Sequence, residues 1–323
     1  MIKQLRKLIK NRGMKTDILL SHFMILIIPI IVNIIIEGFI IGSVKDATDK
    51  SGYLVAENAR TNIDAMIGNA QQITQQINKS ERMQPVYQYA YFKDNYKIKN
   101  SIELLRYTCQ NSYDIDNIFV YNIEGDLVIT SIGRGNSKAF VECYYNDTDI
   151  DYERWQSDSD KCINESFRIV YRNGGKEAAF VEYMAPLTGT GWENVNSSKT
   201  APPAVIIIRL NMDKFKISDE INRKYPGFLL YAVASDGSVI GNEDIAELDG
   251  QYILSQTEKD NSQIFERDRK MYICSRSEKN DWIYVAAIPI WKYNKFSLVG
   301  IIMVIIGTAI VFLLGIKLIK SFI

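Results

Sequence analysis

An apolar segment near the N-terminus, Ile18 to Ile36, constrains this chain more than any other feature, and its only polar residues are Ser21, His22 and Asn33. Leu, Ile, Met, Phe and Val fill it almost throughout, and about 20 such residues in a helix cross the core of a bilayer. Pro29 is tolerated there, because neighbouring groups can satisfy the freed carbonyl. A cleavable signal peptide is the competing interpretation, but the segment is longer than a signal core and no A-x-A pattern follows. We therefore expect a retained transmembrane helix over residues 18–41.

A second apolar segment, residues 297–316, is also long enough to cross a bilayer. Cations crowd a basic arm, residues 1–17, and two lysines follow the second segment. Because cations mark the cytoplasmic side of a membrane, both termini are expected in the cytoplasm and residues 38–295 outside it. The remaining residues, 317–323, would be a cytoplasmic tail that leads to an output part in a longer protein.

Charge and histidine content exclude several function classes. The formal net charge is zero, so a chain with cationic ends has an acidic middle, which disfavours nucleic acid as a partner and leaves the arm to contact membrane lipid. The single histidine, His22, lies within the first apolar segment. The predicted extracytoplasmic part therefore has no histidine for Ser-His-Asp or Cys-His chemistry or for a histidine metal site. We expect neither a cofactor nor an enzyme activity.

The four cysteines do not form a metal or redox motif, since no C-x-x-C occurs. Cys143 and Cys162 flank one polar insertion, and two alternatives remain open for them: a disulfide or buried free thiols. Aspartates alternate between Asp147 and Asp160 as in calcium loops, but the Gly and the terminal Glu of an EF-hand are missing. A solvated loop without metal is the favoured interpretation.

Residues 42–112 have a helical pattern. Apolar residues recur at helical spacing from Val44 to Ser80, which predicts a helix longer than a globular domain needs. Such a helix packs along a domain edge, against its twin in a homodimer, or both. Pro85 ends the pattern, and a shorter helix is expected from Ile98 to Cys109.

The period then changes to two, which predicts antiparallel hairpins. In residues 113–211 we expect about five strands, with two short helices in the insertion between the second and the third. Residues 212–293 repeat this plan in shorter form after a helical start at 211–224. The expected strands are 117–122, 127–132, 166–171, 178–186, 204–210, 228–234, 239–240, 263–267, 271–275 and 282–288, and the expected short helices are 137–144 and 152–156. The fold class is α+β, with a long N-terminal stalk helix and two tandem PAS-like sheets between two transmembrane helices.

This order of elements resembles the double Cache (dCache) sensor modules of bacterial receptors. The opening Leu20-Ser-His-Phe-Met-Ile-Leu-Ile-Ile-Pro29 is most similar to that of membrane-anchored AraC-type regulators and sensor histidine kinases. The resemblance implies that the membrane-distal unit binds a small ligand between its sheet and its insertion, while the membrane-proximal unit relays the signal. The nearest match to the amino-acid-binding motif is Tyr152-Glu-Arg154-Trp155-Gln156, where Gln stands in place of the expected Tyr, so the ligand stays open.

An aromatic-rich insertion is the candidate ligand site, because aromatic walls with a few polar groups bury a ligand and orient it. Trp155 is the strongest candidate, since a Trp in a polar loop would otherwise expose its ring to water. The tyrosines on strands are equally compatible with core or rim positions. The candidate ligand-binding residues are Tyr121, Arg134, Tyr144, Tyr152, Arg154, Trp155, Tyr171 and Tyr183.

Three functions remain open. The first is the extracytoplasmic, homodimeric ligand-sensing part of a receptor that controls an AraC-type regulator or a histidine kinase. The second is a membrane-anchored hydrolase, which would need a carboxylate pair that the sequence does not reveal. The third is an adhesion or scaffold protein, for which we would expect a flat sheet surface without a ligand pocket.

Overall fold

The computed structural model describes residues 14–87, 95–175, 178–188, 202–216, 223–224, 227–241, 249–257 and 262–290, together with 302, 305–310, 313 and 317. Most of the basic arm and of the second apolar segment therefore lies outside the described residues. Among the helices that are described, none combines the length and the apolar character needed to cross a bilayer. The two transmembrane helices stay predictions.

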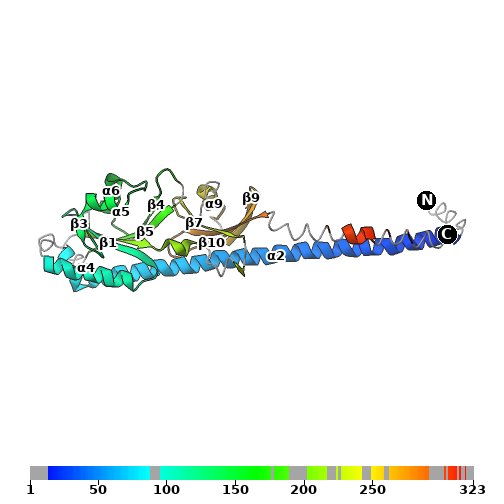
Figure 1. Cartoon of the computed structure of the whole chain (residues 1–323), viewed down its shortest axis with the longest axis horizontal. Coiled ribbons are helices and arrows are strands. Elements are labelled where there is room, and N and C mark those ends of the chain that lie inside the picture. The colour runs from blue at the N-terminus through cyan, green and yellow to red at the C-terminus, as the bar shows by residue number, and fades with distance from the viewer. Residues whose placement is uncertain are drawn as a thin grey trace. The chain divides into compact units, whose positions relative to one another are not determined.

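Helix α2 (Met14–Lys79) is continuous and joins the first apolar segment to the amphipathic segment that follows it (Figure 1). Beyond Gly52 its buried face follows the predicted helical period, with Val55, Ile63, Ile67 and Ala70 all nearly inaccessible to water. Three short helices come next, namely η1 (Glu81–Met83), α3 (Gln84–Tyr87) and α4 (Asn95–Gln110).

The chain divides into two parts. The smaller part comprises Met1–Ser51, Glu266–Met271 and Ile288–Ile323, and the larger part comprises Gly52–Phe265 and Tyr272–Ala287. In the smaller part, the N–H of Ile290 donates to the carbonyl oxygen of Arg269 over 2.8 Å. The larger part holds nearly all of both sheets and all of the candidate site.

The first sheet has six antiparallel strands in the order β3-β2-β1-β6-β5-β4. Five of them were predicted from the sequence, and the sixth, β3, is a short run of exposed residues without apolar alternation. The strands are β1 (Ile115–Asn122), β2 (Leu127–Thr130), β3 (Arg134–Asn136), β4 (Ser166–Tyr171), β5 (Ala178–Leu187) and β6 (Ala204–Leu210).

The second sheet has five strands in the order β8-β7-β11-β10-β9. They are β7 (Leu229–Val233), β8 (Val239–Gly241), β9 (Ser262–Arg267), β10 (Lys270–Arg276) and β11 (Ile283–Pro289), close to the predicted bounds. The helix predicted over 211–224 begins as a 3-10 turn, η3 (Met212–Phe215), and most of the remainder lies outside the described residues. Helix α9 (Gly250–Thr257) was not predicted.

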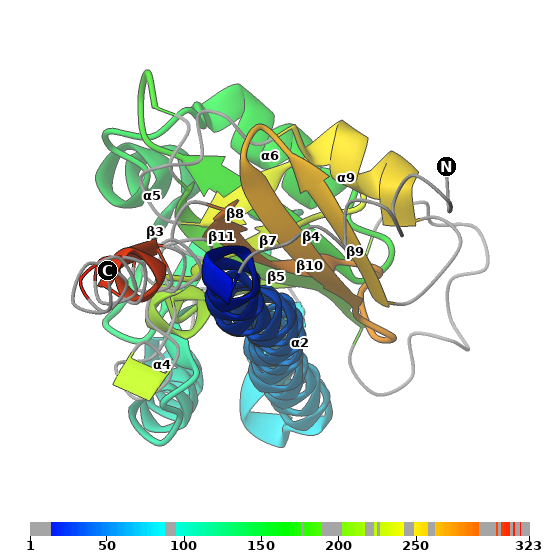
Figure 2. The ribbon, with the colours of Figure 1, turned by 90° about the vertical axis from the view of Figure 1, so that its right-hand side faces the viewer.

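Helices cover both faces of the first sheet. In Figures 1 and 2, α2 and α4 lie on one side, and α5 (Ser137–Tyr144) and α6 (Tyr152–Asp160) lie on the other. Strand β5 serves both faces, because successive side chains point in opposite directions. Val181 and Tyr183 pack in the core with α2, whereas Phe180 and Met184 pack beneath α5 and α6.

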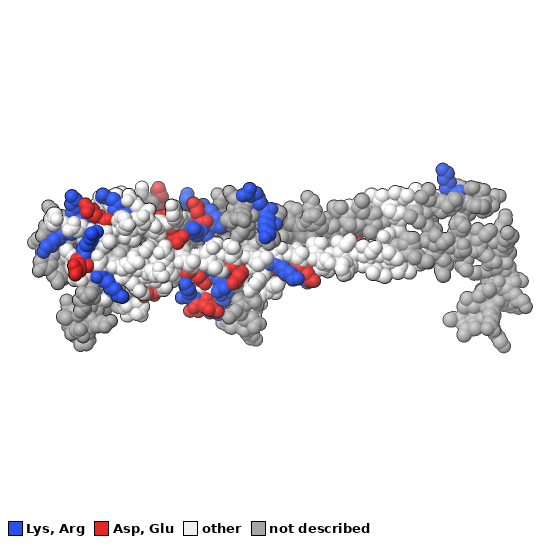
Figure 3. All heavy atoms as spheres, turned by 90° about the horizontal axis from the view of Figure 1, so that it is seen from below, with Lys and Arg blue, Asp and Glu red and all other residues white. Residues whose placement is uncertain are grey.

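The core on the α2 side is shared by both sheets. Leu230 and Tyr284 of the second sheet belong to the same buried cluster as Ile63 of α2 and Ile206 of the first sheet. Trp282, just before β11, is 2% exposed, and its ring lies 5.0 Å from that of Phe167 on β4, measured between centroids. On the face seen in Figure 3, cationic and anionic side chains are interspersed over the described residues.

Candidate functional site

Helix α6 is held at its first turn by a cap that its sequence encodes. The Asp151 carboxylate accepts a hydrogen bond from the N–H of Arg154 over 2.8 Å, which satisfies one of the donors left free at a helix start. Asn136 caps α5 in the same way by accepting from the N–H of Lys138. These caps fix two short helices that would otherwise be marginal, and they orient Trp155 toward the sheet.

Trp155 is completely buried beneath α6, in the middle of an aromatic cluster. Its ring centroid lies 5.0 Å from that of Tyr121 on β1, 5.6 Å from that of Phe140 on α5 and 6.3 Å from that of Tyr145. Such edge and tilted contacts stabilise the packing beyond the area that they bury. The cluster therefore joins both helices of the insertion to the strands opposite.

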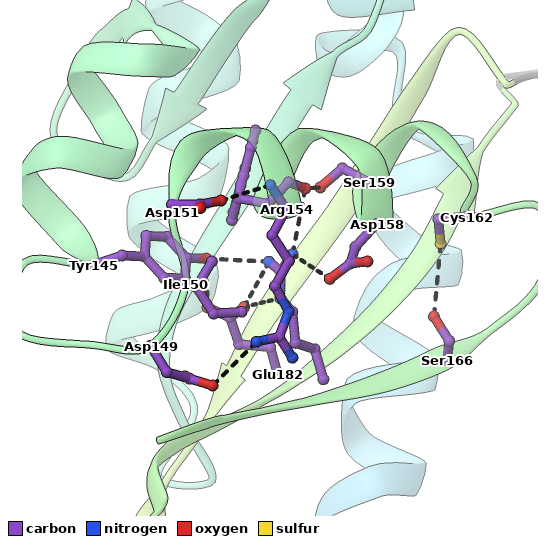
Figure 4. A network of polar contacts seen from close by, with 12 residues as sticks. Tyr145, Asp149, Ile150, Asp151, Arg154, Asp158, Ser159, Cys162, Ser166 and Glu182 are labelled. Carbon is purple, nitrogen blue, oxygen red and sulfur yellow. Dashed lines mark hydrogen bonds and ion pairs between the residues drawn. The ribbon is translucent and has the colours of Figure 1, made fainter. Parts of the chain in front are cut away.

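Beside this cluster lies a buried charged centre built from three neighbouring strands. Figure 4 shows two of its residues, Glu182 and Tyr145, beneath α6. The strand register pairs Arg168 of β4 with Glu182 of β5, and Glu182 with Arg209 of β6. Arg168 donates to Glu182 Oε2 from Nε over 3.0 Å and from Nη2 over 2.8 Å. Glu182 Oε1 accepts from Tyr145 Oη over 2.7 Å and from Arg209 Nη2 over 3.2 Å. Both carboxylate oxygens are thus satisfied without water.

The environment of this centre explains the direction of its pKa shifts. Burial by itself would lower the pKa of Arg168, but the attraction of Glu182 and the neighbouring groups outweighs burial and raises that pKa. Burial raises the pKa of the Tyr145 hydroxyl, and the negative charge of Glu182 adds to the increase. At neutral pH Arg168 therefore stays charged and the Tyr145 hydroxyl stays protonated.

Two buried donors at this centre have no hydrogen-bond partner among the described residues. They are Nε of Arg209 and Nε1 of Trp155. The guanidinium of Arg209 lies 3.5 Å above the ring of Phe180, so its face is covered while this edge donor stays unused. Buried polar atoms nearly always find a partner, so unused donors in a native structure call for an explanation.

A second polar group lies next to Tyr121, at the turn between β1 and β2. Asp126 accepts hydrogen bonds from Tyr121 Oη over 3.3 Å and from Tyr152 Oη over 3.4 Å. Asp160, at the end of α6, has its pKa raised by burial and further by the negative charge of Asp126. One of its carboxylate oxygens, Oδ1, is buried without a hydrogen-bond partner. The aromatic cluster is therefore flanked by an Arg-rich centre and by an acidic group.

The structure brings several of the predicted ligand-binding residues together. Trp155, Tyr121 and Tyr152 surround the aromatic cluster and its acidic edge, and Tyr144 stacks on Phe140 with 4.7 Å between ring centroids. All of these residues lie where the sheet meets the insertion.

The other four predicted residues lie elsewhere. Tyr183 points to the opposite face of the sheet, where its ring contacts that of Phe167. Arg134 is exposed on the edge strand β3, and Arg154 is exposed and pairs with Asp149 over 3.1 Å. Tyr171 donates to the carbonyl oxygen of Val239 in the second sheet over 3.5 Å. For all eight residues, ligand contact stays a prediction.

The sequence analysis missed the charged centre itself. The signal was present, since Arg168, Glu182 and Arg209 each stand between apolar or aromatic residues of a predicted strand. A charged side chain at such a position requires a partner of opposite charge. Two cations and one anion in three strands are consistent with one shared centre.

The cysteines and the acidic loop show no sign of a disulfide or a metal site among the described residues. All four cysteines are free thiols, so Cys143 and Cys162 do not form a disulfide. Cys143 is exposed, whereas Cys162 is buried 3.9 Å from the hydroxyl of Ser166. In the acidic loop, Asp149 accepts from the N–H of Tyr171 over 2.9 Å. Within the described ranges, no group of three or more His, Cys, Asp or Glu residues is placed to hold a metal ion.

Comparison with known proteins finds similarity in structure alone. No family model and no curated protein matches the chain. The sensory domain of the Campylobacter jejuni chemoreceptor Tlp3, solved with isoleucine bound, is 12% identical, with 79% of this chain and 98% of that domain covered at a TM-score of 0.48. The ligand-binding domain of Mlp24, solved with asparagine, is 10% identical, with coverages of 80% and 98% and a TM-score of 0.48.

A third solved structure is the extracellular domain of the histidine kinase candidate vpHK1S-Z8. It is 11% identical, with 79% of this chain and 96% of that domain covered at a TM-score of 0.48. The three structures are, respectively, a sensory domain, a ligand-binding domain and an extracellular domain. The long helix followed by two antiparallel sheets is the layout expected of a double Cache module.

Proposed function

We propose that this chain is the extracytoplasmic ligand-sensing part of a bacterial transmembrane receptor. The ligand is a small molecule that binds where α5 and α6 cover the first sheet. The observation that carries this proposal is the pair of unused buried donors, Trp155 Nε1 and Arg209 Nε, beside an aromatic cluster. Rings and a few fixed polar atoms are the elements of a small-molecule site, and a ligand acceptor would satisfy the unused donors.

The charges at the two ends of the cluster favour a ligand with groups of both kinds. An acceptor group, such as a carboxylate or a hydroxyl, suits the side of Arg168 and Arg209, where the Nε donor of Arg209 is unused. A donor group suits the side of Asp126 and Asp160, where one carboxylate oxygen has no partner. Amino acids, sugars and hydroxy acids all meet this description.

Ligand entry would move the insertion, and this movement is the proposed signal. Trp155 is fully buried, so a ligand can reach its Nε1 atom only if α6 shifts away from the sheet. A ligand that binds the shifted arrangement more tightly than the closed one changes their populations, whereas a ligand with equal affinity for both changes nothing. The closed arrangement is then the ligand-free state.

The proposal includes an anchored receptor with two membrane helices, residues 18–41 and 297–316, and both termini in the cytoplasm. Support comes from the apolar composition of both segments and from α2, which exposes Ile34, Ile35 and Phe39 to 62%, 65% and 77%. We further propose that the receptor is a homodimer, that it contacts membrane lipid, and that it controls an AraC-type regulator or a histidine kinase.

The test is a thermal-shift screen of the full chain in detergent micelles against amino acids, sugars and carboxylates. A ligand present at 100 times its Kd stabilises the folded state by about 2.7 kcal/mol, which raises the melting temperature by roughly 5 °C or more. Trp155→Phe keeps a buried ring but removes the Nε1 donor. We therefore expect this variant to need at least a tenfold higher ligand concentration for the same rise in melting temperature. Tyr107→Phe, at an exposed ring on α4, is the control and should respond like the wild type. The proposal fails if no compound shifts the melting temperature, or if Trp155→Phe responds unchanged.

A further inference from the structure

A groove of about 680 Å³ lies in the larger part of the chain, bordered by residues of α6. One wall is β4, the outermost strand of the first sheet. The opposite wall is formed by two segments of the second sheet, the turn around Asp236 and the loop from Lys279 to Trp282. The groove therefore follows the boundary between the two sheets.

The groove runs along the free edge of β4 rather than over one of its faces. Side chains in a strand alternate between the two faces of a sheet. Five of the six residues of β4 nevertheless line the groove, and they include immediate neighbours. These five residues are Ser166, Phe167, Arg168, Ile169 and Tyr171. Side chains that point to opposite faces of the sheet can border the same groove only if the groove lies along the edge of the strand.

Along most of its length, this edge of β4 carries main-chain groups that form no hydrogen bond with another segment in the described part of the chain. At one end, Asp149 caps the strand, since its N–H donates to the carbonyl oxygen of Tyr171 over 2.9 Å. Further along, no hydrogen bond of the described residues joins the main chain of Phe167 or Ile169 to a group outside the β4–β5 pair. An open strand edge of this kind is a template for pairing with another extended chain.

We propose that the groove binds an extended peptide segment, which pairs with β4 as a seventh strand of the first sheet. Main-chain hydrogen bonds would provide most of the affinity, as in other complexes that add a strand to a sheet edge. Phe167 and Trp282, whose ring centroids are 5.0 Å apart, offer an apolar floor for every second side chain of the peptide.

The charges along the groove also suit a peptide better than a ligand of one sign. Arg154, Lys161 and Lys279 line it together with Asp158 and Asp236, so cations and anions face the same space. A zwitterionic chain with charged side chains of either sign can pair with both kinds of group. Arg168 links the groove to the buried centre, because it lines the groove and also pairs with Glu182.

The test uses a phage-displayed library of random seven-residue peptides and the full chain in detergent micelles. A peptide that the library selects is synthesised together with a version in which alternate main-chain nitrogens are methylated, so that they cannot donate hydrogen bonds. We expect the unmethylated peptide to bind with micromolar Kd and to slow amide hydrogen exchange in residues 166–170 at least tenfold. Methylation on the pairing edge should weaken binding at least tenfold.

Two variants separate the groove from the rest of the surface. Ser235 is exposed and lines the groove, so Ser235→Trp would fill it with an indole ring and should abolish peptide binding. Ser255→Trp, on the exposed side of α9, is the matched control and should bind like the wild type. The proposal is wrong if the library enriches no peptide over the Ser235→Trp variant, or if methylated and unmethylated peptides bind equally well.

Discussion

Arg168 and Glu182 lie opposite each other on neighbouring strands, with 4% and 0% of their side chains exposed, and two hydrogen bonds from the guanidinium reach the same carboxylate oxygen. Removing ions from water is expensive, and here the cost is offset only because every charge has a close partner. The pair holds the edge strand β4 to β5 and lies directly beneath the helix that carries Trp155. The stability of the first sheet should therefore depend strongly on this single carboxylate.

Glu182→Gln should destabilise the protein by about 3–5 kcal/mol, because it removes the carboxylate that both guanidinium groups share and leaves Arg168 only the more distant Asp158, at 3.9 Å. Denaturant unfolding followed by tryptophan fluorescence measures this free energy. Glu124→Gln changes an exposed glutamate in the β1–β2 turn and serves as the control, with an effect within about 0.5 kcal/mol. Equal effects of the two substitutions would show that the buried centre does not stabilise the fold.

Two glycines of α2 should respond in opposite ways to alanine. A Cβ atom at Gly52 would overlap Ile273 Cδ1 and approach Phe228 Cε1 to 2.9 Å, so Gly52→Ala should cost about 1–3 kcal/mol through overpacking. A Cβ atom at Gly68 would meet only the mobile end of Lys279, at 3.1 Å, so Gly68→Ala should add up to about 1 kcal/mol through helix propensity. Thermal unfolding of both variants checks the contrast, and a stable Gly52→Ala protein would contradict the close packing of α2 against β10.

We expect Asp160 to make the folded state less stable as the pH rises. Burial raises its pKa, with a further contribution from Asp126, so the folded state binds a proton more tightly than the unfolded state. Its favourable contribution is present below the unfolded pKa of 3.8 and is lost as pH rises through the higher folded value. Asp160→Asn should therefore melt about 2 °C above the wild type at pH 7, with no difference near pH 3.5.

The matched control for this pH effect is Asp213→Asn. A hydrogen bond from Lys216, 2.8 Å away, lowers the pKa of Asp213, which is the opposite shift. Its substitution should therefore give no gain in melting temperature at pH 7. A gain at Asp213 as large as that at Asp160 would mean that overall charge, and not the local environment of Asp160, causes the effect.

The thiols should react in a fixed order. Cys143 is exposed, whereas Cys274 is buried and its thiol pKa is raised by burial to about 12. At pH 8, Ellman's reagent should titrate Cys143 rapidly in the native protein and Cys274 only after unfolding, because the thiolate is the reactive form. In intact cells, a membrane-impermeant maleimide should label Cys143, with Cys143→Ser as the control. Labelling that requires permeabilised cells would refute an extracytoplasmic location.

Local patterns predicted much of the fold because they reflect local physics. Strands 166–171 and 204–210 and helix 137–144 have the bounds expected from periodicity and turn residues. Strand β3 and helix α9 escaped prediction. The three exposed residues of β3 show no alternation, and they form a strand only because β2 supplies the pairing.

The candidate site was predicted less completely, because strand register is not a local property. Trp155 was predicted as the strongest ligand contact from its position in a polar loop; the structure buries it completely, and ligand contact stays a prediction. The meeting of Arg168, Glu182 and Arg209 depends on which residues of three strands lie opposite one another. The orientation of Tyr183 away from the insertion depends on the same register, since a tyrosine on a strand is compatible with either face.

The two faces of strand β5 consequently depend on its residue count. Deleting Val181 would turn Glu182 toward the apolar packing around α2 and bring the phenol of Tyr183 under α6. Related chains should accordingly vary in the loops at either end of this strand while keeping its residue count, and natural insertions should be found outside it.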